Sequence, residues 1–222
     1  MKKFLLFLLI LVLIPVALLA YLGVVPGLSK YIAKPVDLGV SADKELVYTF
    51  ESKHSMKKDG SGKIELVDDL TSQQVTSIFA VWEDRDIYFP LKNVQVRFNS
   101  DGTGEASGYL EIATAVSLAK NLGYSDSDIQ KGKDYIKYVA GDLPFYVKGT
   151  GGMTTNALSI NATNFQIGKV NVPESITSPL SKVVGDMVYR RLNQIGGANV
   201  RDANFKDGKL HLDATVPDSI KY

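Results

Sequence analysis

The sequence predicts an α+β fold, in which a curved antiparallel sheet wraps around one or two long amphipathic helices and follows an N-terminal transmembrane helix. Three observations support this prediction. Residues 94–112 and 203–217 both alternate apolar and polar side chains around a turn, as hairpins do. Two other segments carry apolar residues at helical spacing. The chain also begins with a long uncharged stretch. Because the hairpins are apolar on one side only, they need cover on one face only.

The uncharged stretch covers residues 4–25 and contains no charged side chain over 22 positions. As a helix it would be ~33 Å long, and the hydrocarbon core of a bilayer is about 30 Å thick. We therefore expect a cytoplasmic tail at 1–3, a transmembrane anchor at 4–25, a stalk or linker at 26–44 and an exported α+β domain at 45–222. The protein is expected at the cell membrane as a single-pass protein with its N-terminus inside and its C-terminal domain extracytoplasmic.

The alternative to an anchor is a cleaved secretory signal that starts at Lys2 and Lys3. Its apolar run exceeds the usual ~7–15 residues of such a signal. The segment Leu18-Leu19-Ala20 also lacks the small residue expected two positions before the final alanine. Under both interpretations the rest of the chain leaves the cytoplasm.

Composition narrows the classes of function. The chain has no cysteine, so it has neither disulfides nor thiol chemistry. Without Lys2 and Lys3 the remaining 23 basic and 24 acidic residues give a net charge of −1, which argues against a nucleic-acid partner. The only histidines are His54 and His211, and His211 alternates with leucines so that it faces water. We expect no cofactor, no metal site and no catalytic residues, although a hydrolase triad assembled only in space stays open as a third hypothesis.

The first part of the exported domain is predicted as two strands and a helix. Residues 45–54 alternate and predict a strand, and 63–67 predict a second. A helix is predicted over 69–85, where Thr71 and Gln74 form a capping-box pattern. Its apolar face carries Val75, Ile78, Phe79 and Trp82.

The central part combines a hairpin, two helices and a strand. The hairpin turns at Asp101-Gly102. Helices are predicted over 114–123, which stops at a glycine, and over 125–141. A short strand is predicted at 142–150.

The C-terminal part is predicted as a bent strand, a long helix and a hairpin. Along 156–172 the alternation slips by one residue between Ala162 and Phe165, as a β-bulge produces. A helix is then predicted to begin with Ser178 as N-cap and Pro179 in the first helical position. Its apolar stripe consists of Leu180, Val183, Val184, Met187, Val188, Leu192 and Ile195.

The apolar faces of the two helices are the candidate site. One interpretation is that they form a sealed core, in a structural or protein-interaction component of the cell envelope. The other is that helix and sheet leave a channel open, because an apolar cavity suits an apolar guest. Under the second interpretation a membrane lipid or another apolar ligand is the partner. The residues expected to bind it are Val75, Ile78, Phe79, Leu180, Val183, Val184, Met187 and Val188.

The C-terminal half also resembles a known pattern. The run NALSINATNFQIGKVNV followed by Pro173, then the long amphipathic helix and NFKDGKLHLDATVP, is similar to small bacterial membrane-anchored envelope proteins of uncharacterised function. Their exported domain resembles tubular, BPI-like lipid-binding modules, in which a sheet wraps a long helix around acyl chains. The likeness covers 65–217 with gaps, includes LTSQQVTSI, and is interrupted by 113–141. It implies lipid or glycolipid contact near the membrane, without a catalytic motif or a residue-specific site.

Overall fold

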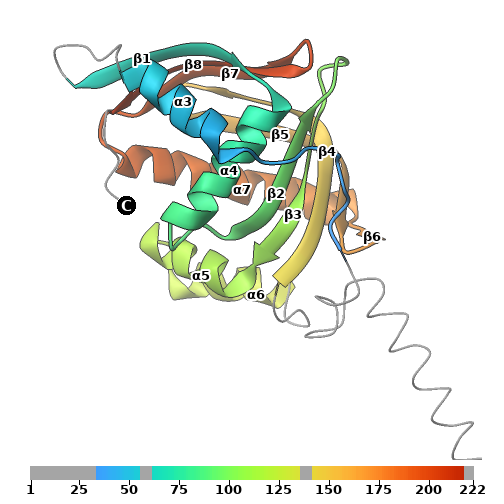
Figure 1. Cartoon of the computed structure of the whole chain (residues 1–222). Helices are drawn as coiled ribbons and strands as arrows, with labels where there is room; N and C mark the ends of the chain where they lie inside the picture. Colours follow the sequence, from blue (N-terminus) through green and yellow to red (C-terminus); the bar gives the residue numbers. More distant parts are fainter. Residues whose placement is uncertain (1–33, 56–61, 136–141, 218–222) are drawn as a thin grey trace, which may run out of the picture.

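The computed structural model describes residues 34–55, 62–135 and 142–217, which form five helices and one eight-stranded antiparallel sheet (Figure 1). The helices are α3 (Lys44–Ser55), α4 (Ser72–Arg85), α5 (Ile112–Asn121), α6 (Asp126–Tyr135) and α7 (Glu174–Gln194). The strands are β1 (Lys63–Leu70), β2 (Leu91–Phe98), β3 (Gly104–Glu111), β4 (Asp142–Thr154), β5 (Ala157–Ile167), β6 (Val170–Asn171), β7 (Asn199–Lys206) and β8 (Lys209–Pro217).

Strand β4 is the junction of the sheet. On one edge it pairs first with β3, over residues 142–149, and then with β7, over residues 152–154. On its other edge it pairs with β5. The sheet therefore has two arms that share β4, with the order β1-β8-β7 in one arm and β2-β3 in the other.

The bulge predicted in the bent strand is confirmed. Lys148 lies opposite Asn164, but the next residue of β4, Gly149, lies opposite Ala162. Thr163 is therefore the extra residue of β5. The shift keeps Leu158, Ile160 and Ala162 on the same face of the sheet as Phe165.

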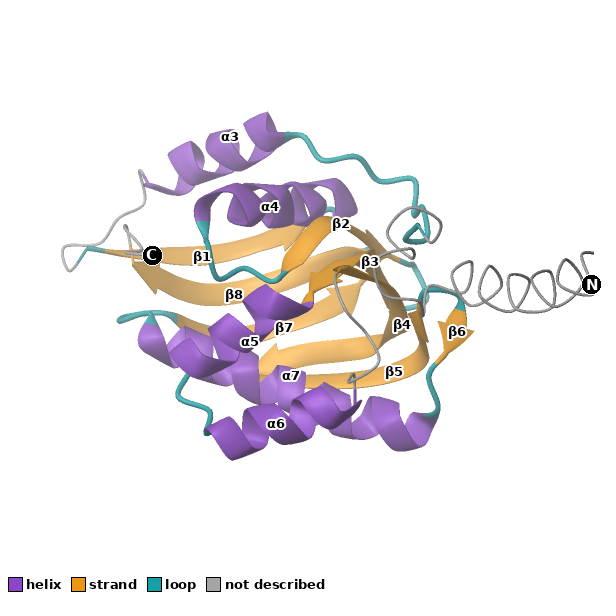
Figure 2. Cartoon of the chain, turned by 90° about the horizontal axis from the view of Figure 1, so that it is seen from below, coloured by secondary structure: helices purple, strands orange, loops and turns teal. Residues whose placement is uncertain are grey.

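The helices cover one face of the sheet (Figure 2). Helix α4 packs on β2 and helix α7 packs on β5. In β5 the apolar residues Leu158, Ile160 and Ala162 are half-buried, whereas the alternating polar residues Ser159 and Asn161 are exposed. The alternation in the sequence thus directs the apolar side chains toward the helices and the polar ones toward the opposite face.

The main hydrophobic core lies between α4 and the two arms of the sheet. Its buried members are Leu70, Val75, Val94, Val96 and Phe98. Partly buried residues of α3, α4 and both arms complete it, namely Phe50, Ile78, Phe79, Leu91, Ala106, Phe205, Leu210 and Leu212. The Phe98 and Phe205 rings, 5.1 Å apart between centroids, join the two arms directly.

Polar side chains of α4 bind the outer edge of β2, which is the last strand of its arm. The Thr76 hydroxyl accepts a hydrogen bond from the Val96 N–H at 2.9 Å and donates one to the Val96 carbonyl at 3.3 Å. The Ser72 hydroxyl accepts from the Phe98 N–H at 2.9 Å, and the Glu83 carboxylate accepts from the Asn93 N–H at 2.8 Å. These groups satisfy backbone donors that a neighbouring strand would otherwise bind.

The predicted fold class is wrong. Five helices accompany the sheet in the described residues, instead of one or two long helices wrapped by it. None of these five combines the length and the apolar composition that a membrane crossing requires. The anchor predicted at 4–25 lies outside the described residues.

The strand predicted over residues 45–54 is wrong, because these residues form most of α3. Leu46, Tyr48 and Phe50 fit an alternating pattern, but Phe50 also belongs to a helical series with Val47 and His54, both of which are buried. Residues 34–43, within the predicted stalk, are irregular and lie against the sheet, where the Leu38 N–H donates to Gln95 Oε1 at 2.7 Å.

The long C-terminal helix also begins earlier than predicted. Its N-cap is Pro173 rather than Ser178, so Pro179 lies inside the helix. The short strand β6 precedes this start, and the Thr177 hydroxyl donates to the carbonyls of Val172 and Pro173, which fixes the first turn. The last six residues of the helix predicted over 125–141 lie outside the described residues, beyond Tyr135.

The contact between α4 and β2 makes a prediction for Thr76→Val. The change keeps the shape of the side chain but leaves the buried Val96 N–H without its acceptor, so we expect the free energy of unfolding to fall by about 1–3 kcal/mol. Chemical denaturation followed by the fluorescence of Trp82 measures this change. Thr163→Val is the matched control, because its hydroxyl is exposed and its loss should alter stability little. Equal stability of Thr76→Val and wild type would contradict the assigned role of this hydroxyl.

Candidate functional site

The predicted site residues on α4 belong to the hydrophobic core. Val75 is one of its buried members, and Ile78 and Phe79 pack against it while partly buried. The Phe79 ring also contacts Trp82 at 5.7 Å and Phe89 at 5.8 Å between ring centroids. These three predicted residues therefore fill the space between α4 and the sheet.

The predicted residues on α7 are less covered. Val183 is 48% exposed and Val184 is 43% exposed, whereas Leu180, Met187 and Val188 are half-buried. The structure thus separates the eight predicted residues into a core group on α4 and a partly open group on α7.

Helix α7 approaches β5 closely at Gly185. A Cβ atom at this position would lie 3.0 Å from the Leu158 carbonyl oxygen, so a larger residue would push the helix away. Successive residues of a helix are 100° apart, which places Val188 beside Gly185 on the side that meets the sheet. Leu180, Val183, Val184 and Met187 extend from there around the helix. We call these four residues the α7 flank.

Polar contacts at its C-terminal half fix the orientation of α7. The Asp186 carboxylate accepts hydrogen bonds from the Tyr124 hydroxyl and from Arg190 Nε, the latter at 2.9 Å. The Arg190 guanidinium lies 4.4 Å from the centre of the Tyr124 ring and donates to the Leu122 carbonyl. Burial and the adjacent Asp186 carboxylate raise the pKa of Tyr124 to about 12. The neutral phenol therefore keeps its proton for this hydrogen bond throughout the physiological range.

A second contact joins α7 to the end of α4. Arg191 donates to Asp86 at 2.8 Å, and the Asp86 N–H donates to the Trp82 carbonyl as the C-cap of α4. Arg191 is two helical turns from Val184 and one turn from Met187, so it projects from the same side of the helix as the flank. The flank therefore faces the α4 end of the molecule, where Trp82 and Phe89 lie 5.9 Å apart. Sequence analysis did not identify Phe89 or the Asp86–Arg191 pair, because the partners are 105 positions apart.

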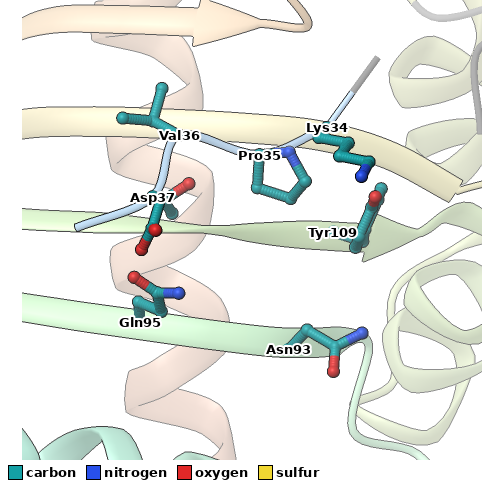
Figure 3. Close-up of a pocket in the computed structure, with 8 residues that line it drawn as sticks. Lys34, Pro35, Val36, Asp37, Asn93, Gln95 and Tyr109 are labelled. Atoms are coloured by element: carbon teal, nitrogen blue, oxygen red, sulfur yellow. The ribbon is translucent and has the colours of Figure 1, made fainter. Parts of the chain in front are cut away.

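Two hollows occur elsewhere on the described surface. The smaller, about 230 Å³, lies between residues 34–37 and the polar side chains of β2 and β3, including Asn93, Gln95 and Tyr109 (Figure 3). The larger, about 520 Å³, lies between residues 39–41, the start of α4 and the turn from β7 to β8. Neither hollow includes any of the eight predicted residues.

A buried carboxylate links three strands on the face opposite the helices. Glu105 of β3 is 6% exposed, and it accepts hydrogen bonds from Asn99 at 2.9 Å, from Arg97 at 2.9 Å and from the Tyr146 hydroxyl at 2.8 Å. Burial acts to raise the pKa of Glu105, but the hydrogen bonds from Asn99, Arg97 and Tyr146 outweigh it and the pKa is lowered. A carboxylate with this many donors is stabilised as an anion, which suits a structural role better than proton transfer.

The two histidines occupy different surroundings. His211 Nδ1 lies 2.8 Å from Asp69 Oδ1. The His211 ring is partly exposed on the last strand, which agrees with the prediction that it faces water. His54 is buried beside the Phe50 ring, and its Nε2 lies 3.4 Å from Asp68. Among the residues with described positions, no group of three histidine or acidic side chains is arranged to hold a metal ion.

Comparison with known proteins adds no relative. No protein-family model matches the chain. No curated protein and no solved structure matches it either. The resemblance to envelope proteins with BPI-like modules therefore stays a proposal.

The environment of Glu105 predicts an acid-sensitive contribution to stability. Because its pKa is lowered in the folded state, the carboxylate stabilises the fold above its unfolded pKa of roughly 4.3, and this contribution is lost as the pH falls through the folded pKa. We expect Glu105→Gln to lower the free energy of unfolding at pH 7 by about 1.5–3 kcal/mol. The loss should be smaller in acid.

Urea unfolding of both proteins at neutral and at acidic pH tests this expectation. Glu45→Gln, on the exposed first turn of α3, is the matched control and should behave as wild type. A loss for Glu105→Gln that is the same at both pH values would contradict a charged Glu105 as the stabilising form.

Proposed function

We propose that this chain is a membrane-tethered extracytoplasmic binding module, which holds a lipid-like apolar ligand against the α7 flank. The observation that carries the proposal is the exposure of Val183 and Val184 beside half-buried Leu180 and Met187. A contiguous exposed apolar surface of this kind often marks an interaction site. Covering it stabilises the complex by about 25 cal/mol for each Å² of apolar surface removed from water.

The chemistry of the flank favours a ligand with a long apolar part. None of its four side chains carries a charge or a hydrogen-bonding group, so they would select the ligand by apolar contact alone. The charged residues at the next turn of α7 already have partners, because Arg190 binds Asp186 and Arg191 binds Asp86. An acyl chain fits these requirements. The uncharged segment at 4–25 and the resemblance to BPI-like modules support the same class of ligand.

The alternative function is a structural or protein-interaction component of the cell envelope with a sealed core and no ligand. The burial of Val75 in the core, with Ile78 and Phe79 packed against it, favours this alternative for the α4 part of the predicted site. The flank would then be covered by an apolar surface of a partner protein. The two functions differ in whether a free lipid binds to the isolated chain.

A fluorescence titration tests the proposed function, since Trp82 is the only tryptophan of the chain. In the full-length protein in detergent, a fatty acid that carries a doxyl quencher should reduce Trp82 fluorescence in a saturable way, and unlabelled fatty acid should reverse it. Val184→Asp should weaken binding at least tenfold, because a charge would be buried under the ligand. Native mass spectrometry of the wild type should show an adduct of lipid mass.

The control is Val67→Asp, which places the same charge at a side chain of β1 that is 61% exposed and lies on the opposite face of the sheet from the core residue Leu66. It should bind as wild type does. Quenching that does not saturate, or that is identical in all three proteins, would count against a binding site on α7 and favour the sealed core.

A further inference from the structure

Three exposed apolar side chains gather at one end of the domain. Val36, in the segment that leads into the domain, is 40% exposed. Val170 of β6 is 39% exposed, and Ile176, in the first turn of α7, is 37% exposed. We call these three residues the β6 end.

Strand pairs and hydrogen bonds place Val36 and Val170 over neighbouring strands but on opposite faces of the sheet. Val36 borders Ser107 and Tyr109 on the face away from the helices, whereas Val170 pairs with Ile167, which shares the helix-covered face with Phe165 (Figure 3). Ile176 follows β6 closely, in the first turn of α7.

Residues 34–36 border the same hollow as Tyr109 of β3, and Tyr109 pairs with Pro144 of β4. The Pro144 carbonyl in turn accepts a hydrogen bond from the Gly168 N–H at 2.6 Å, in the turn between β5 and β6. Neighbouring strands are about 4.8 Å apart, so two strand spacings, about 10 Å in all, separate Tyr109 from the turn between β5 and β6. Figures 1 and 2 both show β6 beside the point where the described chain begins.

The length of the preceding chain keeps this end close to the uncharged segment. Only residues 26–33 separate residue 25 from Lys34. Eight residues span at most about 29 Å when fully extended, at about 3.6 Å each. If residues 4–25 cross a membrane, the β6 end is therefore the part of the described domain that the connection holds near the lipid surface.

We propose that the β6 end contacts the surface of the lipid bilayer, with Val170 and Ile176 on the helix side of the sheet as the contacting side chains. This inference rests on the proposed function, because it requires the membrane tether at 4–25. The charged residues at this end are of both signs, with Lys34 and Lys169 near Asp37 and Glu174. Contact is therefore driven by the apolar side chains and does not need anionic lipids.

The contact gives the proposed ligand a route. Ile176, Leu180, Val183, Val184 and Met187 follow one another at spacings of three and four residues or as neighbours, so they form a continuous apolar line along α7. The line starts at the β6 end and ends at the turn before Arg191, which binds Asp86. An acyl chain that leaves the bilayer at Ile176 would meet apolar side chains along its whole way to the flank.

Site-specific labelling tests the inference, and the absence of cysteine makes it simple. Full-length Val170→Cys and Ile176→Cys each carry one environment-sensitive fluorophore after reconstitution into phosphatidylcholine vesicles. The controls are Val67→Cys on β1 and Ile87→Cys, which is 84% exposed in the turn after α4. Figure 1 shows β1 and the C-terminal end of α4 on the other side of the domain from β6.

We expect the labels at 170 and 176 to emit at shorter wavelength in vesicles and to be quenched by lipids with a doxyl group near the headgroup. The labels at 67 and 87 should keep the emission of a probe in water. Equal emission of all four labels would overturn the inference, and so would a shift confined to the controls. In that case the titration with Trp82 still decides the proposed binding of an apolar ligand. Failure of the wild type to float with the vesicles would instead contradict the tether, on which both proposals depend.

Discussion

The hydrogen bonds from α4 to the outer edge of β2 are the constraint on which the rest of the structure depends. The hydroxyls of Ser72 and Thr76 lie one helical turn apart, so they meet the N–H groups of Phe98 and Val96, which point outward from the same side of the strand. With α4 held there, Val75 closes the core against both arms of the sheet. Helix α3 then packs on α4, where the Ser77 hydroxyl accepts from the Asp43 N–H at 2.9 Å.

Helices α4 and α7, which cover different parts of the sheet, are therefore packed against it to different degrees. Helix α4 is fixed by hydrogen bonds from Ser72, Thr76 and Glu83 to β2 and by a core on its apolar side. Helix α7 has one buried residue, Thr177. It approaches β5 closely at Gly185, and polar contacts hold its first turn and its C-terminal half. Segments with few buried contacts open at low cost in free energy, and binding sites are commonly drawn from them. This difference is the physical basis for placing the proposed ligand on α7 rather than on α4.

Sequence patterns predicted local features well where the cause is local. The capping box of Thr71 and Gln74 is present, and the bulge falls at Thr163, because caps and alternation depend on residues a few positions apart. Residues 45–54 fit both the alternating pattern of a strand and the spacing of a helix, and their packing on α4 favours the helix. The number of helices on the sheet, and hence the fold class, depends on long-range packing that periodicity does not encode. For the same reason the sequence grouped Val75 with Val184, although one is core and the other is exposed.

The junction in β4 has a consequence for how the domain deforms. Between the last residue paired with β3 and the first paired with β7, Thr150 and Gly151 have no registered partner on that edge of the strand. Glycines at 149, 151 and 152 surround this step. The twist of β4 can therefore change abruptly at this step, because glycines have no side chains that would resist the change. A rotation of one arm relative to the other would be concentrated at this glycine-rich step, while β5 pairs with β4 on the opposite edge both before and after the bulge at Thr163.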